Sequence, residues 1–162
     1  MSEDSFPQAA ARHLHDAQIL LNVLNEEREE RLDNAVYLAG YVVECSFKVL
    51  VTVYLSEDIE EIKTHGHDLK KLQGKAMNRL RLMYPVLDMQ LPTSRIQGTI
   101  LSRNHPERRY AKSGLWNKTE AKDAVERAEQ IYQEIIPKLI LDGIIALDGT
   151  LTELANRNLR EL

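Results

Sequence analysis

Residues 34–55, NAVYLAGYVVECSFKVLVTVYL, predict a helix whose circumference is almost entirely apolar or small. A helix of this kind is buried in a protein interior. One line of polar side chains crosses it, within a stripe about 60° wide: Tyr37, Tyr41, Glu44 and Lys48. Because an isolated buried charge is strongly unfavourable, Glu44 and Lys48 must be paired or used for function. We therefore expect the stripe to be buried or to line a cleft.

The composition is that of one globular domain with a core of ordinary size. The chain has 162 residues, 43% hydrophobic and 28% charged, with a net charge of −4. That charge argues against broad non-specific binding to nucleic acid but permits a local basic patch. The single cysteine, Cys45, excludes a disulfide within the chain and favours a reducing compartment. On this apolar helix it is best interpreted as a small core residue.

No secretory or membrane segment is predicted. Residues 1–13 are acidic and lack the long apolar run of a secretory signal. Residues 34–55 have the length of a membrane span, but Glu44 and Lys48 near the middle make spanning unfavourable. We therefore expect a cytoplasmic protein.

Apolar residues recur mostly at helical spacing and strand signals are nearly absent, so the chain is predicted to be all-α. We expect residues 1–140 to form a helical bundle and residues 141–162 to form a C-terminal extension. Helices are expected at 7–28, 34–55, 68–84, 94–102, 117–137 and 152–160.

The boundaries of these helices follow from capping residues and prolines. The expected caps are Ser5 for the first helix, Asp33 or Asn34 for the second, and Asn117 or Thr119 for the last long one. Leu32 and Asp33 would form the connection that leads into the second helix. Pro137 should kink or end the last long helix.

The C-terminal extension repeats Leu-Asp-Gly at 141–143 and 147–149, with apolar residues between the two copies. Such a short apolar segment fits a strand or a docking arm. We expect it to contribute a contact between copies of this chain.

The turn THGHDL at 64–69 brings two histidines close to Asp68. Its simplest interpretation is a capping turn, in which Asp68 or His67 caps the helix that follows and Gly66 supplies the bend. Metal ligation is the alternative, but no other Cys or His cluster completes a site. No metal and no cofactor is therefore predicted.

The loop RNHPERRY at 103–110 is rich in cationic and aromatic side chains. An Arg fork binds phosphate or carboxylate, and a neighbouring Tyr can stack on a base. Two plainer interpretations stay open: a solvated basic loop, or Arg109 pairing with Glu44 in the interior.

Three segments of the chain resemble the HEPN superfamily of small all-α domains. They are YLAGYVVECSFK at 37–48, HGHDL at 65–69 followed by Leu72, and PERRY at 106–110 ahead of a long helix. In this order they span roughly residues 8–138. The resemblance implies an up-and-down bundle of four or five helices, usually dimeric. Family members include RNA-cutting toxins, abortive-infection and CRISPR-linked nucleases, and non-catalytic forms that bind RNA or nucleotides.

The chain departs from the nuclease forms of this family at their catalytic motif. Those forms carry an Arg followed, after four to six residues, by a His that aids proton transfer across a dimer interface. After Arg103 the matching positions hold Arg108, Arg109 and Tyr110, and His105 lies only two residues on. A Tyr with an ordinary pKa of about 10 is a poor general base at neutral pH.

The preferred prediction is a non-catalytic HEPN-like module that binds RNA, a nucleotide or a protein partner, within a prokaryotic defence or toxin–antitoxin system. The expected binding residues come from the helix stripe, the histidine turn and the basic loop: Tyr41, Glu44, Lys48, His67, Arg103, Arg108, Arg109 and Tyr110.

Two alternatives remain at this point. The first is a divergent metal-independent endoribonuclease, in which Arg103 holds the phosphate and His105 or Tyr110 replaces the missing His. The second is a protein without a nucleic-acid role, such as the partner of a nucleotidyltransferase in a two-gene unit. In that case Glu44 and Lys48 form an ordinary i, i+4 pair in a core helix.

Overall fold

The computed structural model describes residues 5–23, 30–55, 64, 66–67, 74, 96, 98–103, 105–150 and 152–153. These residues form three α-helices, α1 (Phe6–Asn22), α2 (Glu30–Leu55) and α5 (Lys118–Leu141), and two 3₁₀ turns, η2 (Ile100–Ser102) and η3 (Glu107–Tyr110). Within the described part of the chain there is no strand, which confirms the all-α prediction. The predicted helix at 68–84 lies outside the described residues, except for the helical Gly74.

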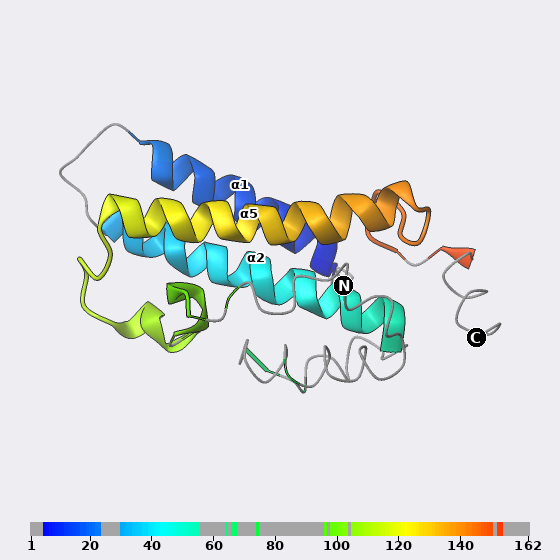
Figure 1. Ribbon diagram of the computed structural model, residues 1–162, viewed down its shortest axis with the longest axis horizontal. Helices are drawn as coiled ribbons and strands as arrows, with labels where there is room; N and C mark the ends of the chain where they lie inside the picture. The colour runs from blue at the N-terminus through cyan, green and yellow to red at the C-terminus, as the bar shows by residue number, and fades with distance from the viewer. Residues whose placement is uncertain are drawn as a thin grey trace.

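The three long helices lie side by side along the length of the molecule (Figure 1). α1 runs opposite to α2, while α2 and α5 run in the same direction. The short turns η2 and η3 lie beside the first half of α2, which is where the candidate site forms.

α1 begins as its sequence predicts and ends early. The Ser5 hydroxyl accepts a hydrogen bond from the Gln8 amide at 3.4 Å, and Pro7 occupies the first turn. The buried face contains Ala10, Leu14 and Ala17. The predicted end near residue 28 is wrong, because Val23 is already extended. Val23, directly after the last residue of α1, is 41% exposed, so burial does not favour extending the helix through it.

α2 begins at Glu30, so the predicted connection at Leu32 and Asp33 is wrong. Leu32 is buried in the core, and the apolar packing of this residue extends the helix upstream. Asp33 does not cap α2. Its carboxylate instead accepts hydrogen bonds from the backbone amides of Gly114 (2.7 Å) and Trp116 (3.1 Å) and so holds the segment that leads into α5.

α2 is the core helix that its composition predicts. Both Val42 and Val43 are fully buried, and Cys45 is 6% exposed. Burial raises the pKa of the Cys45 thiol to about 12, so the thiol stays protonated and inert at neutral pH. Residues Glu30–Val53 are long and apolar enough to cross a membrane by length and composition alone. In the most apolar 18 residues of this stretch 78% are buried inside the protein, so the packing of a core helix accounts for the same composition.

α5 starts with a complete capping box. The Asn117 side chain accepts a hydrogen bond from the Glu120 amide (2.9 Å), and the Glu120 carboxylate accepts one from the Asn117 amide (3.0 Å). This confirms Asn117 as the cap. Pro137 does not end the helix, which continues to Leu141. The buried neighbours Ile136 and Leu139 hold the helix together on both sides of the proline.

The segment after α5 folds back on the start of α1, and Ile145 within it makes an isolated β-bridge. The Ala146 amide donates to the Thr150 carbonyl (2.8 Å), which closes a turn. The Ser5 hydroxyl donates to the Asp148 carbonyl (3.2 Å). Ile145 is buried, whereas Leu141 and Leu147 are 86% and 85% exposed. Of the helix predicted at 152–160, only residues 152–153 are described.

Candidate functional site around Glu44

The polar stripe of α2 is organised around the carboxylate of Glu44, which is only 2% exposed. Lys48, one turn further along the helix, donates to Oε1 at 2.8 Å. His105 Nε2 lies 2.9 Å from Oε2, and His67 Nδ1 lies 3.1 Å from each oxygen. The buried charge is therefore paired, as the sequence required, but two of its three partners come from distant loops.

The electrostatics of Glu44 follow from these contacts. Burial alone raises the pKa of this carboxyl, but the hydrogen bonds from His105 and Lys48 and the positive charge of Lys48 outweigh burial and lower the pKa to about 2. Glu44 is consequently ionised at neutral pH. Burial also lowers the pKa of His105 below its usual value, although Glu44 opposes the shift. A neutral His105 bonded to a carboxylate carries its proton on Nε2, and its Nδ1 is buried without a hydrogen-bond partner.

Aromatic rings enclose this carboxylate. The Tyr41 ring packs edge-on against His105, with centroids 4.7 Å apart, and against His67 at 5.8 Å. On its α1 side Tyr41 contacts the half-buried His13 at 5.5 Å. The Tyr37 hydroxyl donates to the Tyr41 hydroxyl at 3.1 Å. We call this set the Glu44 cluster: His13, Tyr37, Tyr41, Glu44, Lys48, His67 and His105.

Further contacts fix the protonation of Tyr41 and the position of Lys48 in this cluster. Burial and then the hydrogen bond with Tyr37 raise the pKa of Tyr41 above its usual value, so its hydroxyl keeps its proton at neutral pH. The Lys48 ammonium lies 5.3 Å from the centre of the Phe6 ring, a cation–π contact that adds a second partner beside Glu44.

Gly40 allows the basic loop to approach α2 closely. A Cβ at this position would lie 2.6 Å from His105 Nδ1 and 2.9 Å from Arg108 Nη2. Arg108 is 8% exposed and donates to the carbonyl oxygens of Ile100 (3.0 Å) and Leu101 (3.3 Å), so it braces η2 from inside. Burial lowers the pKa of Arg108 to about 10, which still leaves it charged at neutral pH.

Arg109 and Tyr110 lie at the solvent edge of the Glu44 cluster. The Arg109 guanidinium lies over the Tyr110 ring at 4.6 Å, and Tyr110 is 77% exposed. The neighbouring Tyr37 hydroxyl raises the pKa of Arg109. The hypothesis that Arg109 pairs with Glu44 is wrong, because Glu44 is already enclosed by Lys48, His67 and His105 while Arg109 is exposed.

The predicted binding residues therefore separate into three groups. Four of them meet in the cluster: Tyr41, Glu44, Lys48 and His67. Arg108 touches the same region, but its guanidinium is used on backbone carbonyls. Arg103, Arg109 and Tyr110 are exposed.

Sequence reasoning missed three members of this site. His105 was considered only as a substitute catalyst, yet its side chain is 1% exposed and bonded to Glu44, a position that a substrate does not reach. Gly40 had no signal beyond its place in an apolar helix. His13 did have one, since it directly precedes Leu14 on the buried face of α1.

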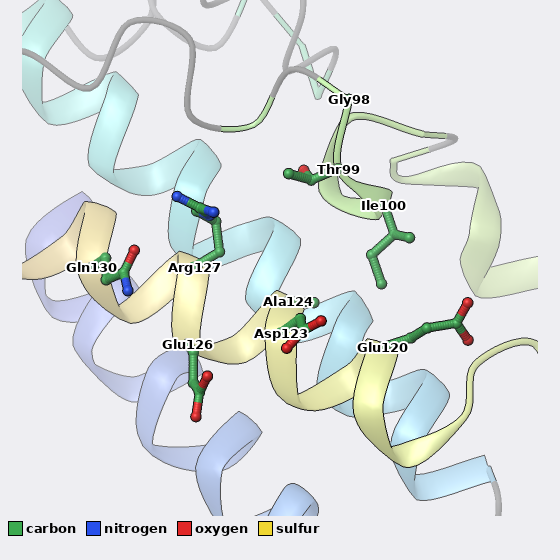
Figure 2. Close-up of a pocket in the computed structure, with 9 residues that line it drawn as sticks. All are labelled: Gly98, Thr99, Ile100, Glu120, Asp123, Ala124, Glu126, Arg127 and Gln130. Atoms are coloured by element: carbon green, nitrogen blue, oxygen red, sulfur yellow. The ribbon is translucent and has the colours of Figure 1, made fainter.

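A second hollow lies outside the Glu44 cluster. Figure 2 shows it between residues 98–100 and α5, with a volume of about 460 Å³. Its α5 wall carries Glu120, Asp123 and Arg127, while Glu126 points away from the loop. The side chains that line it bring no buried polar atom to the opening, so we assign no ligand to it.

Among the residues that the structure describes, no three His, Cys, Asp or Glu side chains are arranged to hold a metal ion. Around Glu44 the reason is visible, because both carboxylate oxygens already accept hydrogen bonds. The chemistry open to this site is therefore hydrogen bonding, charge and proton transfer.

Comparison with known proteins found no relative, so a function must be argued from the residues of the Glu44 cluster and its solvent edge. No protein-family model matches the chain, and no match to a curated protein or to a solved structure was found.

Proposed function

We propose that this protein is a HEPN-like helical bundle that binds an anionic ligand, an RNA segment or a nucleotide, at the surface formed by Arg109, Tyr110 and the open edge of the Glu44 cluster. The observation that carries the proposal is the state of Arg109. Its guanidinium is exposed and stacked on Tyr110, and none of the described carboxylates pairs with it.

This arrangement suits a phosphate with a base attached. A guanidinium presents parallel N–H donors that match two phosphate oxygens. An exposed Tyr ring offers a face on which any base can stack. The contact with the Tyr110 ring restrains Arg109 before a ligand arrives, which reduces the side-chain entropy lost on binding.

The order of the sequence segments supports the HEPN-like part of the proposal. The polar helix, the histidine turn and the basic loop are brought together at Glu44, and a long capped helix follows them. By this resemblance we further propose a cytoplasmic homodimer that works in a prokaryotic defence or toxin–antitoxin unit, with a nucleotidyltransferase as a candidate partner. The neighbouring gene is the quickest test of that context.

We prefer a binding function to RNA cleavage by Arg103, His105 or Tyr110, the catalytic residues that the sequence suggested. The alternative endoribonuclease used Arg103 with His105 or Tyr110. His105 is enclosed between Glu44, Tyr41 and Gly40 and so lacks access to a substrate. Tyr110 is exposed, but no described group bonds its hydroxyl in a way that would activate it as a base.

The test is the affinity of purified protein for a fluorescein-labelled single-stranded RNA of twelve nucleotides, measured by fluorescence anisotropy, with adenosine and guanosine nucleotides as competitors. Arg109→Glu should weaken binding by about 10- to 100-fold, because a hydrogen bond to a charged group contributes about 1.5–3 kcal/mol. Affinity should also fall as salt rises.

The matched control is Lys122→Glu, which reverses one exposed charge on α5 away from the cluster. Its affinity should match that of the wild type. If wild type, Arg109→Glu and Lys122→Glu bind RNA and nucleotides equally, or none of them binds, the proposal is rejected. A co-purifying protein partner in the absence of RNA binding would then favour the assembly role.

A further inference from the structure

The basic loop carries buried and exposed side chains next to each other. His105 and Arg108 are each 8% exposed, whereas Tyr110 is 77% exposed and its neighbour Arg109 also faces solvent. The hydrogen bond of η3 from the Arg109 amide to the Pro106 carbonyl (3.2 Å) is local, so it shapes the turn without attaching it to a helix. The two buried side chains seat the loop against α2 and η2, and the position of the exposed pair depends on them.

His105 fits tightly against α2. Its Nε2 lies 2.9 Å from Glu44 Oε2, and the Tyr41 ring packs edge-on against it at 4.7 Å. At the other nitrogen, a Cβ on Gly40 would lie only 2.6 Å from Nδ1. Nδ1 is buried and has no hydrogen-bond partner. A proton on Nδ1 would therefore be a buried donor without an acceptor, which is costly because the group loses its hydration and gains no bond.

The charges around His105 also oppose a second proton on its ring. The Arg108 guanidinium approaches the same place as Nδ1, because a Cβ on Gly40 would lie 2.9 Å from Arg108 Nη2. Glu44 favours the protonated ring, but its carboxylate already accepts a hydrogen bond from Lys48 at 2.8 Å. Burial is the main reason that the pKa of His105 is lowered, and Arg108 adds to it. The titratable and charged groups that face this ring are Tyr37, Tyr41 and Glu44 from α2, Arg108 from η3, and His67 from the histidine turn.

Acid therefore acts on the basic loop through this ring. The seated loop holds His105 neutral, whereas a released His105 takes up a proton at the ordinary pKa of about 6.5. The seated form is thus fully favoured above pH 6.5, and its population relative to the released form falls by up to about tenfold for each pH unit below that value. Because Arg109 and Tyr110 belong to the same short loop, release removes them from the edge of the Glu44 cluster.

We propose that protonation of His105 releases the basic loop from α2 and so switches off binding of the anionic ligand in mild acid. This inference rests on the proposed function, since it concerns regulation of the same surface. Histidine is the side chain whose charge ordinarily changes in this pH range. The direction separates the effect from general electrostatics, because acid adds positive charge to a protein and by itself strengthens the attraction for phosphate.

The test is the affinity of the full chain for a rhodamine-labelled oligouridine of twelve nucleotides at pH 7.5, 6.5 and 5.5, measured by fluorescence anisotropy at constant ionic strength. Uracil does not titrate in this range, and the phosphodiesters stay ionised. Wild-type affinity should fall by about 5- to 10-fold from pH 7.5 to 5.5, since one proton taken up at a pKa of 6.5 gives at most about a tenfold change. The matched control is His15→Gln, at an exposed histidine of α1, which should show the same fall.

His105→Gln should remove the fall in affinity. The Gln amide can donate to Glu44 from about the place of Nε2, and it does not titrate. The affinity of this variant should therefore not decrease between pH 7.5 and 5.5. If it decreases as in the wild type, the inference is overturned.

Gly40→Ala tests how the loop is seated without changing a titratable group, and it keeps the test valid where His105→Gln does not fold. The added Cβ would push against His105 and Arg108, so the loop should already be partly released at pH 7.5 and bind the oligouridine more weakly than the wild type does. Gly74→Ala, where a Cβ would meet nothing within 4 Å, should match the wild type. A Gly40→Ala protein that binds as tightly as the wild type overturns the inference.

Circular dichroism at each pH separates release of the loop from unfolding. The helical signal of the wild type should stay constant down to pH 5.5, and a helical signal lost in parallel with affinity overturns the inference. Wild-type affinity that is constant or rises in acid also overturns it and leaves the proposed function standing. Wild type that binds no RNA at any of these pH values overturns both.

Discussion

Glu44 shows how a single buried charge is accommodated on an apolar helix. Its carboxylate takes the Lys48 ammonium from its own helix and imidazoles from two loops. Removing the negative charge would leave Lys48, itself 4% exposed, without an anion in the interior. Breaking one side of a buried pair is far more damaging than losing an exposed pair, because the remaining charge stays desolvated.

We therefore expect Glu44→Gln to lower the free energy of unfolding by about 3–5 kcal/mol, measured by urea denaturation at pH 7. The matched control is Glu126→Gln, which removes the exposed i, i+4 partner of Lys122 at 3.6 Å. That change should alter stability by at most about 0.5 kcal/mol. If the two substitutions lowered the free energy of unfolding by similar amounts, Glu44 would not be a buried charge on which its partners depend.

His67 and His105 show which part of the site the sequence revealed. The stripe at i, i+4, i+7 and i+11 identified Tyr41, Glu44 and Lys48 as residues that need partners. It did not identify those partners, because they come from loops in which residue spacing carries no periodic information. His67 was predicted to cap a helix or to bind a ligand, and its bond to Glu44 comes from the folded chain alone.

At the scale of elements, α2 and the basic loop are brought together by the absence of one side chain. Gly40 lies where a Cβ would meet His105 and Arg108 at 2.6 and 2.9 Å. A helix interior normally favours Ala over Gly by about 1 kcal/mol. Here the close approach of the loop outweighs that preference, because both neighbours are buried and held by their own hydrogen bonds.

Gly40→Ala should accordingly destabilise the protein by about 1–3 kcal/mol, as overpacking of a core does. Gly74→Ala is the control at the other helical glycine that the structure describes, where an added Cβ would meet nothing within 4 Å. It should leave stability unchanged or raise it by up to about 1 kcal/mol. Thermal unfolding followed by circular dichroism measures both. A Gly40→Ala protein as stable as wild type would show that the loop can move away without loss.

Some helix boundaries were predicted correctly from the sequence and others were not. The start of α5 was predicted correctly because Asn117 and Glu120 form a local capping box. The end of α1 and the start of α2 were predicted wrongly, because buried contacts such as those of Leu32 extend or stop a helix independently of its caps. Pro137 was expected to kink or end α5, and buried neighbours carry the helix past it.

At the scale of the whole molecule, the Glu44 cluster joins side chains from separate parts of the chain. His13 comes from α1, Glu44 from α2, and His67 and His105 from the region between α2 and α5. Protonation of Glu44 would weaken all of its contacts at once, so the acid stability of the fold should depend on this one carboxyl.

We expect the free energy of unfolding to fall at every step as the pH is lowered. The pKa of Glu44 falls from 4.5 to about 2 on folding, so it stabilises the fold above pH 4.5 and loses that contribution as pH drops toward 2. The full contribution is about 3 kcal/mol. His105, whose pKa is also lowered, adds a loss that begins below about pH 6.5. Stability should thus decline steadily under acid, as followed by urea denaturation from pH 7 to 2.5.

Glu44→Gln should lack the part of this decline between pH 4.5 and 2, because Gln does not titrate. The gap in stability between wild type and variant should therefore narrow as pH falls. A constant gap across this range would assign acid sensitivity to other carboxyls.

Local order in the sequence determined that the protein is all-α, that α2 is buried, that Glu44 and Lys48 need partners and that Asn117 starts α5. These properties depend on periodicity and capping within a few residues. The tertiary structure alone decided that His67 and His105, 23 and 61 residues from Glu44, hydrogen bond to its carboxylate. It also decided that Arg108 is buried while Arg109 faces solvent. Such contacts depend on how loops close over a packed core, and that closure is set by shape and burial across the whole chain.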